Sequence, residues 1–387
     1  MTAKNSVTFS FCAEKCFDNS RQSMLFQFIT SILYSILVMG VVAEFCYGQT
    51  CPDAKTDSLI QIGIAQSIQH NYSQAESIFQ NLTETYPDHP IGYFFMAAML
   101  QSKMIDYETD RWSEDFRRYI RLAIDKAENR KTQDLWAMFY HGSALCYLAF
   151  YEGRNGDYLK AINHGFSGIA ILKKIVNIDP EFHDAYFGIG SYQYWRSQKT
   201  RLLNWLPLIS DGRAEGIELV RRSVELGRYT RYIAMSELIW ILLDAGEADE
   251  AYAWAVRGLK QFPQSRFFLW GAAKSAYAME NFAAAASYFQ NLLNSIVNSP
   301  MDNDYNEFLC RLKLAQCLEK LGKLAEASHQ IAMIDSLALS EKLKNKLKKQ
   351  RSELTQLKSR LANLAKIESP IASSVLEHQL ADKQRRQ

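Results

Sequence analysis

Two consecutive stretches of the chain, between residues 232 and 297, carry the same helical pattern at the same spacing. Leu242 and Ala251 in the first stretch recur as Ala276 and Ala285 in the second, which gives a period of 34 residues. Each stretch is predicted to form two helices joined by a tight turn, with small side chains where the helices approach closely. A chain built on such a unit has to stack its repeats, because each unit buries its apolar face only against its neighbours.

The same template matches the chain at three other places. The matching positions are Gly63, Ala75, Phe79 and Pro87 near the start, Asp179, Pro180, Tyr186, Ile189 and Gly190 in the middle, and Leu314, Ala315, Leu318, Ala327 and Ile331 near the end. Between them, segments 91–130 and 132–178 are amphipathic and helical but longer than one repeat. The period therefore slips in these two segments.

A 34-residue helix-turn-helix period is typical of the tetratricopeptide repeat (TPR), and residues 246–263, GEADEAYAWAVRGLKQFP, resemble the second half of such a repeat with its closing proline. The chain thus resembles TPR proteins, of the exported bacterial type. The resemblance implies an all-α fold, a right-handed superhelical solenoid of about seven helix pairs with a long C-terminal helix. Composition agrees, since 48% of the 387 residues are hydrophobic and only 8 are proline.

The N-terminal region contains a long apolar segment, residues 24–43, which has no charged side chain and follows Arg21. This arrangement is typical of a secretory signal, and residues 46–48, Cys-Tyr-Gly, suit cleavage before Gln49. The segment is also close to the length that spans a bilayer, so an uncleaved anchor stays open. We expect residues 1–48 to be a signal peptide or membrane anchor. The protein is then exported to the periplasm or envelope of a bacterium, and membrane-anchored if residues 24–43 are not cleaved.

Residues 198–213, QKTRLLNWLPLISDGR, place an apolar insertion where a short repeat turn is expected. Such a segment either folds back over a repeat interface or contacts a partner or lipid. Residues 211–220, DGRAEGIELV, resemble a motif of the TPR-like family of the mitochondrial outer membrane that is linked to inclusion-body clearance. The likeness is confined to this short stretch and transfers no function.

A long basic helix is predicted from Ser340, since residues 340–366 hold nine Lys and Arg against two Glu. Its apolar stripe consists of Leu347, Leu354, Leu357, Leu361 and Leu364. We expect this helix to cover the last repeat, with a coiled-coil dimer or an anionic-membrane contact as alternatives. The predicted domains are a TPR-like solenoid at 49–338, a basic capping helix at 339–367 and a flexible tail at 368–387.

The sequence lacks the patterns that carry catalysis or cofactor binding. It has no Gly-rich phosphate loop before Lys-Ser/Thr, no HExxH pair and no zinc spacing among its 7 cysteines. Asp302, Asp304 and Asn306 begin like a calcium loop, but Glu307 replaces the required glycine and Lys313 the final glutamate. We therefore predict no enzyme activity, no cofactor and no metal. A net charge of +2 with one basic segment also argues against a nucleic-acid partner.

The repeat register predicts where a partner binds. In TPRs, the resemblance implies, positions 2, 5, 9 and 12 of each first helix line the concave groove. Numbering from His183, Tyr232 and Arg266 gives Phe187, Ser191, Tyr194, Ser236, Trp240, Trp270, Lys274 and Tyr277. The set departs from the Lys/Asn clamp that holds a terminal carboxylate in some TPRs, so stacking on an apolar or extended segment is favoured. Trp240 and Trp270 would alternatively be core residues.

Taken together, these patterns predict a non-catalytic protein-protein interaction scaffold of the cell envelope, which binds a protein or peptide in the groove of a TPR solenoid. The alternative is a membrane-associated accessory protein. In that hypothesis segment 24–43, the insertion 198–213 and the basic helix all contact lipid.

Overall fold

The computed structural model describes residues 53–130, 134–200, 211–364 and 366. The expected signal or anchor at 1–48 lies outside these residues, as do 201–210 of the apolar insertion and the tail at 368–387. The chain divides after residue 57, and residues 58–387 form one compact unit. None of the helices in the described residues is long and apolar enough to cross a bilayer.

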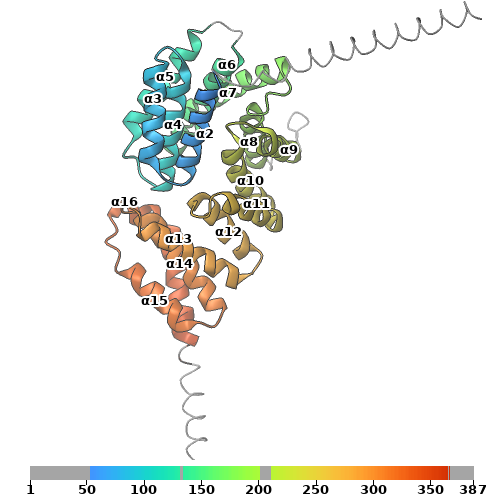
Figure 1. Ribbon diagram of the computed structural model, residues 1–387. Coiled ribbons are helices and arrows are strands. Elements are labelled where there is room, and N and C mark those ends of the chain that lie inside the picture. The colour runs from blue at the N-terminus through green and yellow to red at the C-terminus, as the bar shows by residue number, and fades with distance from the viewer. Residues whose placement is uncertain (1–52, 131–133, 201–210, 365, 367–387) are drawn as a thin grey trace, which may run out of the picture. The chain divides into compact units, whose positions relative to one another are not determined.

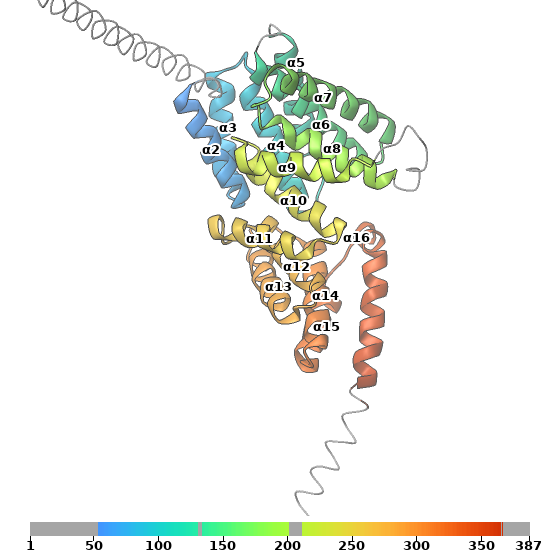
Figure 2. The same ribbon diagram turned by 90° about the vertical axis from the view of Figure 1, so that its right-hand side faces the viewer.

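The described residues form helices without strands, and successive helices pack on one another (Figure 1, Figure 2). The seven pairs are α2 (Ala54–Ile68) and α3 (Tyr72–Thr85), α4 (Pro90–Asp106) and α5 (Ser113–Glu128), α6 (Leu135–Arg154) and α7 (Tyr158–Ile178), α8 (Ala185–Lys199) and α9 (Arg213–Leu226), α10 (Arg231–Ala245) and α11 (Ala248–Gln261), α12 (Arg266–Ala278) and α13 (Phe282–Val297), and α14 (Asp304–Lys320) and α15 (Leu324–Asp335). The short helix α16 (Glu341–Lys346) and a helical segment at 348–364 follow. The prediction of an all-α, TPR-like array of helix pairs is confirmed.

The turns within the pairs reuse one backbone conformation. Gly246 between α10 and α11 has φ 88°, and Glu280, 34 positions later between α12 and α13, has φ 58°. Gly322 between α14 and α15 and His70 between α2 and α3 also have positive φ. The left-handed conformation favours glycine, so Glu280 and His70 adopt it at a cost that the flanking helices outweigh.

Small residues bring the helices of α10–α11 and α12–α13, here called the regular pairs, close together. Ala251 and Ala285, the repeat positions expected to face the partner helix, are fully buried. Gly258 of α11 lies against the ring of Phe268, which a Cβ at position 258 would strike. The 34-residue period therefore reflects packing, because the space between the helices at these positions admits only a methyl group or a hydrogen atom.

Segments 91–130 and 132–178 fold as the longer pairs α4–α5 and α6–α7. Helices α6 and α7 have 20 and 21 residues, against 15 and 14 for α10 and α11. Their interior is aromatic, and Trp136 lies at its centre with ring centroids 4.6 Å from Phe182 and 5.0 Å from Tyr229. Trp136 is only 6% exposed, so its ring packs between helices.

The predicted leucine stripe of the basic segment joins the core of the last repeats. Leu347, Leu354, Leu357 and Leu361 belong to the buried cluster that contains Ile331 and Ile334 of α15, whereas Leu364 is partly exposed. Lys358 pairs with Asp335 at 2.7 Å, and Arg360 pairs with Glu319 at 2.6 Å. The segment thus contacts both α14 and α15.

A buried ion pair links the end of α4 to the start of α12. Arg266 Nε donates to Asp106 Oδ1 at 2.7 Å, and both residues are less than a tenth exposed. His70 Nδ1 lies 3.1 Å from Asp106 Oδ2, and Tyr72 donates to the same oxygen at 3.0 Å. Burial acts to raise the pKa of Asp106, but the bonds from Arg266 and His70 outweigh it and hold this pKa well below its usual value. The cluster therefore joins elements about 160 residues apart in sequence.

Candidate partner-binding face

Helices α8, α10 and α12, the first helices of three successive pairs, line two hollows. The apolar pocket is lined by Ile64, Ser67, Ile68, Phe79, Phe94, Phe95, Ala98, Met99, Ser102, Phe139, Ser143, Tyr147, Phe187, Tyr229, Thr230, Tyr232, Ile233, Ser236, Phe267 and Phe268. The lysine hollow is lined by Trp195, Trp240, Leu243, Asp244, Lys274, Tyr277, Ala278 and Lys313. All three helices contribute to both hollows, so we call their shared surface the binding face.

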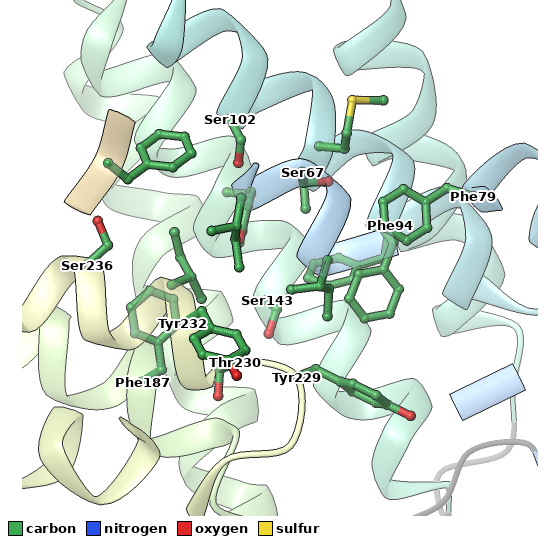
Figure 3. A pocket seen from close by; sticks show the side chains of 18 of the residues that line it. Ser67, Phe79, Phe94, Ser102, Ser143, Phe187, Tyr229, Thr230, Tyr232 and Ser236 are labelled. Atoms are coloured by element: carbon green, nitrogen blue, oxygen red, sulfur yellow. The ribbon is translucent and has the colours of Figure 1, made fainter. Parts of the chain in front are cut away.

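The apolar pocket is a small cavity of about 100 Å³ whose walls are mainly aromatic and aliphatic (Figure 3). Phe79 and Phe94 lie on one side of it, and Phe187 and Tyr232 on another. A cavity of about 150 Å³ holds benzene, so this one suits a single aliphatic side chain. Serine hydroxyls at positions such as Ser236 border the apolar walls and could bond to a peptide backbone.

One buried carboxylate shapes the wall between α9 and α10. Asp184, which is 1% exposed, accepts hydrogen bonds from the backbone N–H groups of Arg228, Tyr229 and Thr230 at 3.0, 2.7 and 2.8 Å. Its Oδ1 also accepts from Thr230 Oγ1 at 3.0 Å. Because these bonds fix the turn before α10, Asp184 positions Tyr229 and Thr230 at the pocket.

The lysine hollow, of about 460 Å³, combines two cations with aromatic walls. Lys313 Nζ donates to Gln316 at 2.8 Å, lies 3.4 Å from Glu353 and stands 5.2 Å from the centre of the Tyr277 ring. Lys274 approaches the Trp270 ring at 5.9 Å. Both lysines therefore lie among aromatic rings that limit their contact with water.

The positive charge of Lys274 is less well neutralised by carboxylates than that of Lys313. Burial, and then the charge of Lys313, lower the pKa of its amine to about 8, although Glu353 acts in the opposite direction. No carboxylate of the described residues lies within ion-pair distance of this amine. A desolvated ammonium without a close counter-charge is unfavourable in the free protein and becomes favourable when an anion reaches it.

The side chains around the lysine hollow are held by their own hydrogen bonds. Trp195 Nε1 donates to Glu237 at 2.6 Å, and burial raises the pKa of that carboxyl group. The Tyr194 hydroxyl donates to Asp244 at 2.7 Å. Trp240 is 37% exposed, so its ring is open to contact.

The structure distributes the eight predicted residues over four environments. Phe187 and Ser236 line the apolar pocket, and Trp240, Lys274 and Tyr277 line the lysine hollow. Trp270 is half-buried and packs on Phe289 with ring centroids 6.0 Å apart. Ser191 is half-buried, and Tyr194 is fully buried, so Tyr194 presents no ring to a partner.

The register misses residues for two physical reasons. On α8, positions 187 and 191 continue to 195 at the i+4 spacing of one helix face, so Trp195 rather than Tyr194 reaches the hollow. On α4 and α6 the template had slipped, and Phe94, Phe139 and Ser143 were not recognised as pocket walls. The spacing of Phe139, Ser143 and Tyr147, four residues apart on α6, was the available signal.

The chain was compared with known families and structures. The sequence matches no protein-family model, and no curated protein matches it. Within the described residues, no three His, Cys, Asp or Glu side chains gather in a way that could hold a metal ion.

Several solved structures resemble this chain, all at low identity. A chain of the APC/C hetero-tetramer Cut9-Hcn1 is 14% identical over 74% of this chain and 48% of that chain, with a TM-score of 0.48. The matched region thus spans about half of that protein. A Rap protein complexed with Competence and Sporulation Factor is 11% identical over 79% and 80% of the two chains, with a TM-score of 0.46. Part of a TPR protein from Cytophaga hutchinsonii is 15% identical over 74% and 98%, with a TM-score of 0.39.

Proposed function

We propose that the chain is a non-catalytic binding scaffold, which holds an extended segment of another protein along α8, α10 and α12. The observation that carries this proposal is that three successive first helices open both hollows on one face. The apolar pocket takes residues from the start of each of these helices and the lysine hollow takes residues from nearer its end, so such a face recognises a segment that runs along the helices from one hollow to the other.

The first anchor of the bound segment is an aliphatic side chain in the apolar pocket. The pocket volume of about 100 Å³ admits one such group, and its aromatic walls supply the contact area. The serine hydroxyls at the rim can bond to backbone N–H and C=O groups beside it. An aliphatic side chain flanked by main chain is thus the chemistry that fits.

The second anchor is a carboxylate that approaches Lys274. Lys274 and Lys313 provide the positive charge, and Trp240 and Tyr277 provide flat walls for the neighbouring side chain. The residues predicted from the register depart from the Lys/Asn clamp of some TPRs, so carboxylate capture is not expected from the register alone. Bringing Lys313 into the hollow with Lys274 changes that expectation, and an acidic side chain suits both.

The two anchors have a defined spacing. Phe187 in the apolar pocket and Trp195 in the lysine hollow are eight residues apart on α8, which corresponds to about 12 Å along the helix axis. An extended chain covers this distance in about four residues. The proposed target is therefore an extended segment with an aliphatic residue and an acidic residue about four positions apart.

The apolar segment 24–43 in the sequence supports an exported or membrane-anchored setting for this binding. The alternative of a lipid-contacting accessory protein receives less support from the basic helix. Four leucines of its stripe are buried, and Lys358 and Arg360 are paired with acidic residues of α15 and α14. Its two other parts, segment 24–43 and residues 201–210 of the insertion, lie outside the described residues.

Site-specific photo-crosslinking in the native cell envelope tests the proposal. A photoreactive amino acid replaces Trp240 on the binding face or Trp254 on α11, the second helix of the same pair. Trp254 is half-buried and bonds to Glu250 at 3.0 Å, so the two sites are matched in residue type and repeat. We expect a protein adduct from position 240 and none from 254. An adduct from 254 alone would assign binding to the other side of the repeat.

A further inference from the structure

Helix α7 carries an apolar stripe that no described element covers. Tyr158, Leu159, Ile162 and Phe166 are 68%, 86%, 54% and 59% exposed. Their successive spacings are one, three and four residues, so they share one face of the first half of the helix. The second half behaves differently, since Ile169, Leu172 and Ile175 are buried. The exposed stripe, here called the α7 stripe, extends over about 12 Å.

Helices α7 and α8 are basic, whereas α6, which also packs on α7, carries Glu152 and Arg154 near its end. Helix α7 contains Lys160, Lys173 and Lys174, the neighbouring helix α8 contains Arg196 and Lys199, and neither helix contains an acidic residue. All five side chains are exposed. Within the described residues only Lys160 forms an ion pair, with Asp157 at 3.4 Å. The charge around the stripe is therefore available to an anionic partner.

The stripe and these charges belong to one surface. Helices α7 and α8 pack on each other, and the Phe166 and Tyr192 rings lie 5.9 Å apart across them. Lys173 is almost two turns beyond Phe166 and recurs on the face of the stripe, where the apolar side chains end. Gly188 lies against Leu172 and Tyr192 against Phe166, so α8 runs back toward the start of α7. Arg196 and Lys199 therefore lie beside the apolar side chains, and Lys173 and Lys174 lie beyond them on α7.

We propose that the α7 stripe inserts into the interface of an anionic lipid bilayer, with α7 lying in the plane of the membrane. Leu159, Ile162 and Phe166 enter the region of the acyl chains, and Tyr158 stays at the level of the headgroups, where its ring and hydroxyl are both accommodated. Lys173, Lys174 and Lys199 contact lipid phosphates. This site is separate from the binding face and does not depend on the function proposed for it.

A bilayer fits the stripe better than an acidic protein surface, because of how the side chains stand. Leu159 is 86% exposed, so it projects from the helix instead of forming the floor of a groove. A projecting apolar side chain needs a matching pocket in a protein partner, whereas a bilayer receives it at any position. The charge of this surface also favours a bilayer, because Lys and Arg beside an apolar helix face are attracted to anionic headgroups.

The test uses the full chain with a fluorescent noncanonical amino acid at position 159. The matched control carries it at position 226, because Leu226 on α9 is a similarly exposed leucine at 53%. Each protein is mixed with vesicles of 70% phosphatidylcholine and 30% phosphatidylglycerol, or of phosphatidylcholine alone. A local probe is used because segment 24–43 could attach the chain to vesicles by itself without bringing position 159 to the lipid.

Insertion predicts a blue shift of emission at position 159 with anionic vesicles and none at position 226. The paired variant Lys173→Gln/Lys174→Gln should weaken the response about tenfold or more, since each basic residue near an anionic surface contributes about fivefold. Raising the salt concentration should weaken it as well, through screening.

Three results would overturn the proposal. The first is emission at 159 that does not respond to anionic vesicles while the chain sediments with them, which assigns attachment to another segment. The second is emission that is already blue in buffer and independent of concentration, which means that the chain itself, for example residues 201–210, covers the stripe. The third is a blue shift that appears only as protein concentration rises, which identifies a second copy as the occupant.

Discussion

The regular pairs α10–α13 and the longer pairs α4–α7 reach the same arrangement of packed helices with different side chains. In the regular pairs, contacts between helices are made by Ala251, Ala255, Ala276 and Ala285, all fully or almost fully buried. In the longer pairs, much of the space between helices is filled by rings, such as Phe94 and Tyr140 with centroids 5.4 Å apart, although Gly142 of α6 and Gly168 of α7 also approach each other closely.

This difference explains where a repeat can be recognised. Small residues fix both the position of a contact and the distance between helix axes, so they recur at a constant period. Large rings fill a given space from several positions, so helices of 20 and 21 residues pack as well as shorter ones without keeping the period. Helices can therefore pair in this way even where the sequence does not keep the repeat motif.

The ion pair that links the two regions should give the largest effect on stability. Arg266→Met leaves Asp106 buried without its main counter-charge, and we expect the free energy of unfolding to fall by about 3 to 5 kcal/mol. Lys126→Met is the control, because Lys126 pairs with the exposed Asp88 and its loss should change the free energy of unfolding little. Chemical denaturation measures both.

The same pair predicts an acid dependence. The folded-state pKa of Asp106 lies below its unfolded value, so the contribution of the charged form is complete above about pH 5 and is lost as the pH falls through the acid range. Unfolding curves at several pH values should show a steeper acid loss in the wild type than in Arg266→Met. Equal slopes would mean that this pair does not hold the two regions together.

Adding one methyl group at a glycine should change the stability in opposite directions in the two regions. In the regular pairs, Gly258→Ala forces a Cβ against Phe268, and we expect a loss of about 1 to 3 kcal/mol. In the longer pairs, Gly153→Ala has room, since the nearest atom would be the Ala161 Cβ at 3.6 Å, and should stabilise α6 by up to about 1 kcal/mol. Thermal unfolding of the two variants should give opposite shifts, because a Cβ fits at position 153 and does not fit at position 258.

Unlike the small side chains of the regular pairs, Lys274 destabilises the folded protein, so its replacement should raise stability. A pKa lowered from 10.5 to about 8 penalises the charged amine in the folded state, so Lys274→Met should raise the free energy of unfolding at pH 7 by about 1 to 2 kcal/mol. The penalty is complete below pH 8 and disappears as the pH rises towards 10.5, where the two proteins should converge. Lys260→Met on α11 is the exposed control. If Lys274→Met were less stable than the wild type, Lys274 would instead stabilise the fold.

The smallest effects concern the two turns that are 34 residues apart. Glu280→Gly relieves a side chain held at φ 58° and should add about 1 kcal/mol of stability. Gly246→Ala, at φ 88° in the equivalent turn, should remove about 1 kcal/mol. Thermal unfolding measures both, and changes of the same sign would show that the two turns are not equivalent.

The sequence predicted the fold further than the site. Periodic small residues were enough for the all-α repeat and for placing Trp240, Lys274 and Tyr277 on one surface, because α10 and α12 keep the register. Trp195 was missed because position 195 continues the four-residue spacing of Phe187 and Ser191, whereas the register selects Tyr194, which is fully buried. Lys313 was missed because α12 and α14 begin 38 residues apart and so do not keep the 34-residue period. Asp184 and the Asp106–Arg266 pair depend on contacts between residues more than 40 apart, which no local pattern reports.

The most direct test of the binding face is the affinity of the crosslinked partner for Trp240→Ala and Trp254→Ala, with melting temperatures measured alongside. Trp240 is 37% exposed and lines the lysine hollow, so its removal should weaken binding about tenfold or more with little change in melting temperature. Trp254→Ala should bind like the wild type. Unchanged affinity in Trp240→Ala, together with weakened binding in Trp254→Ala, would contradict the proposed face.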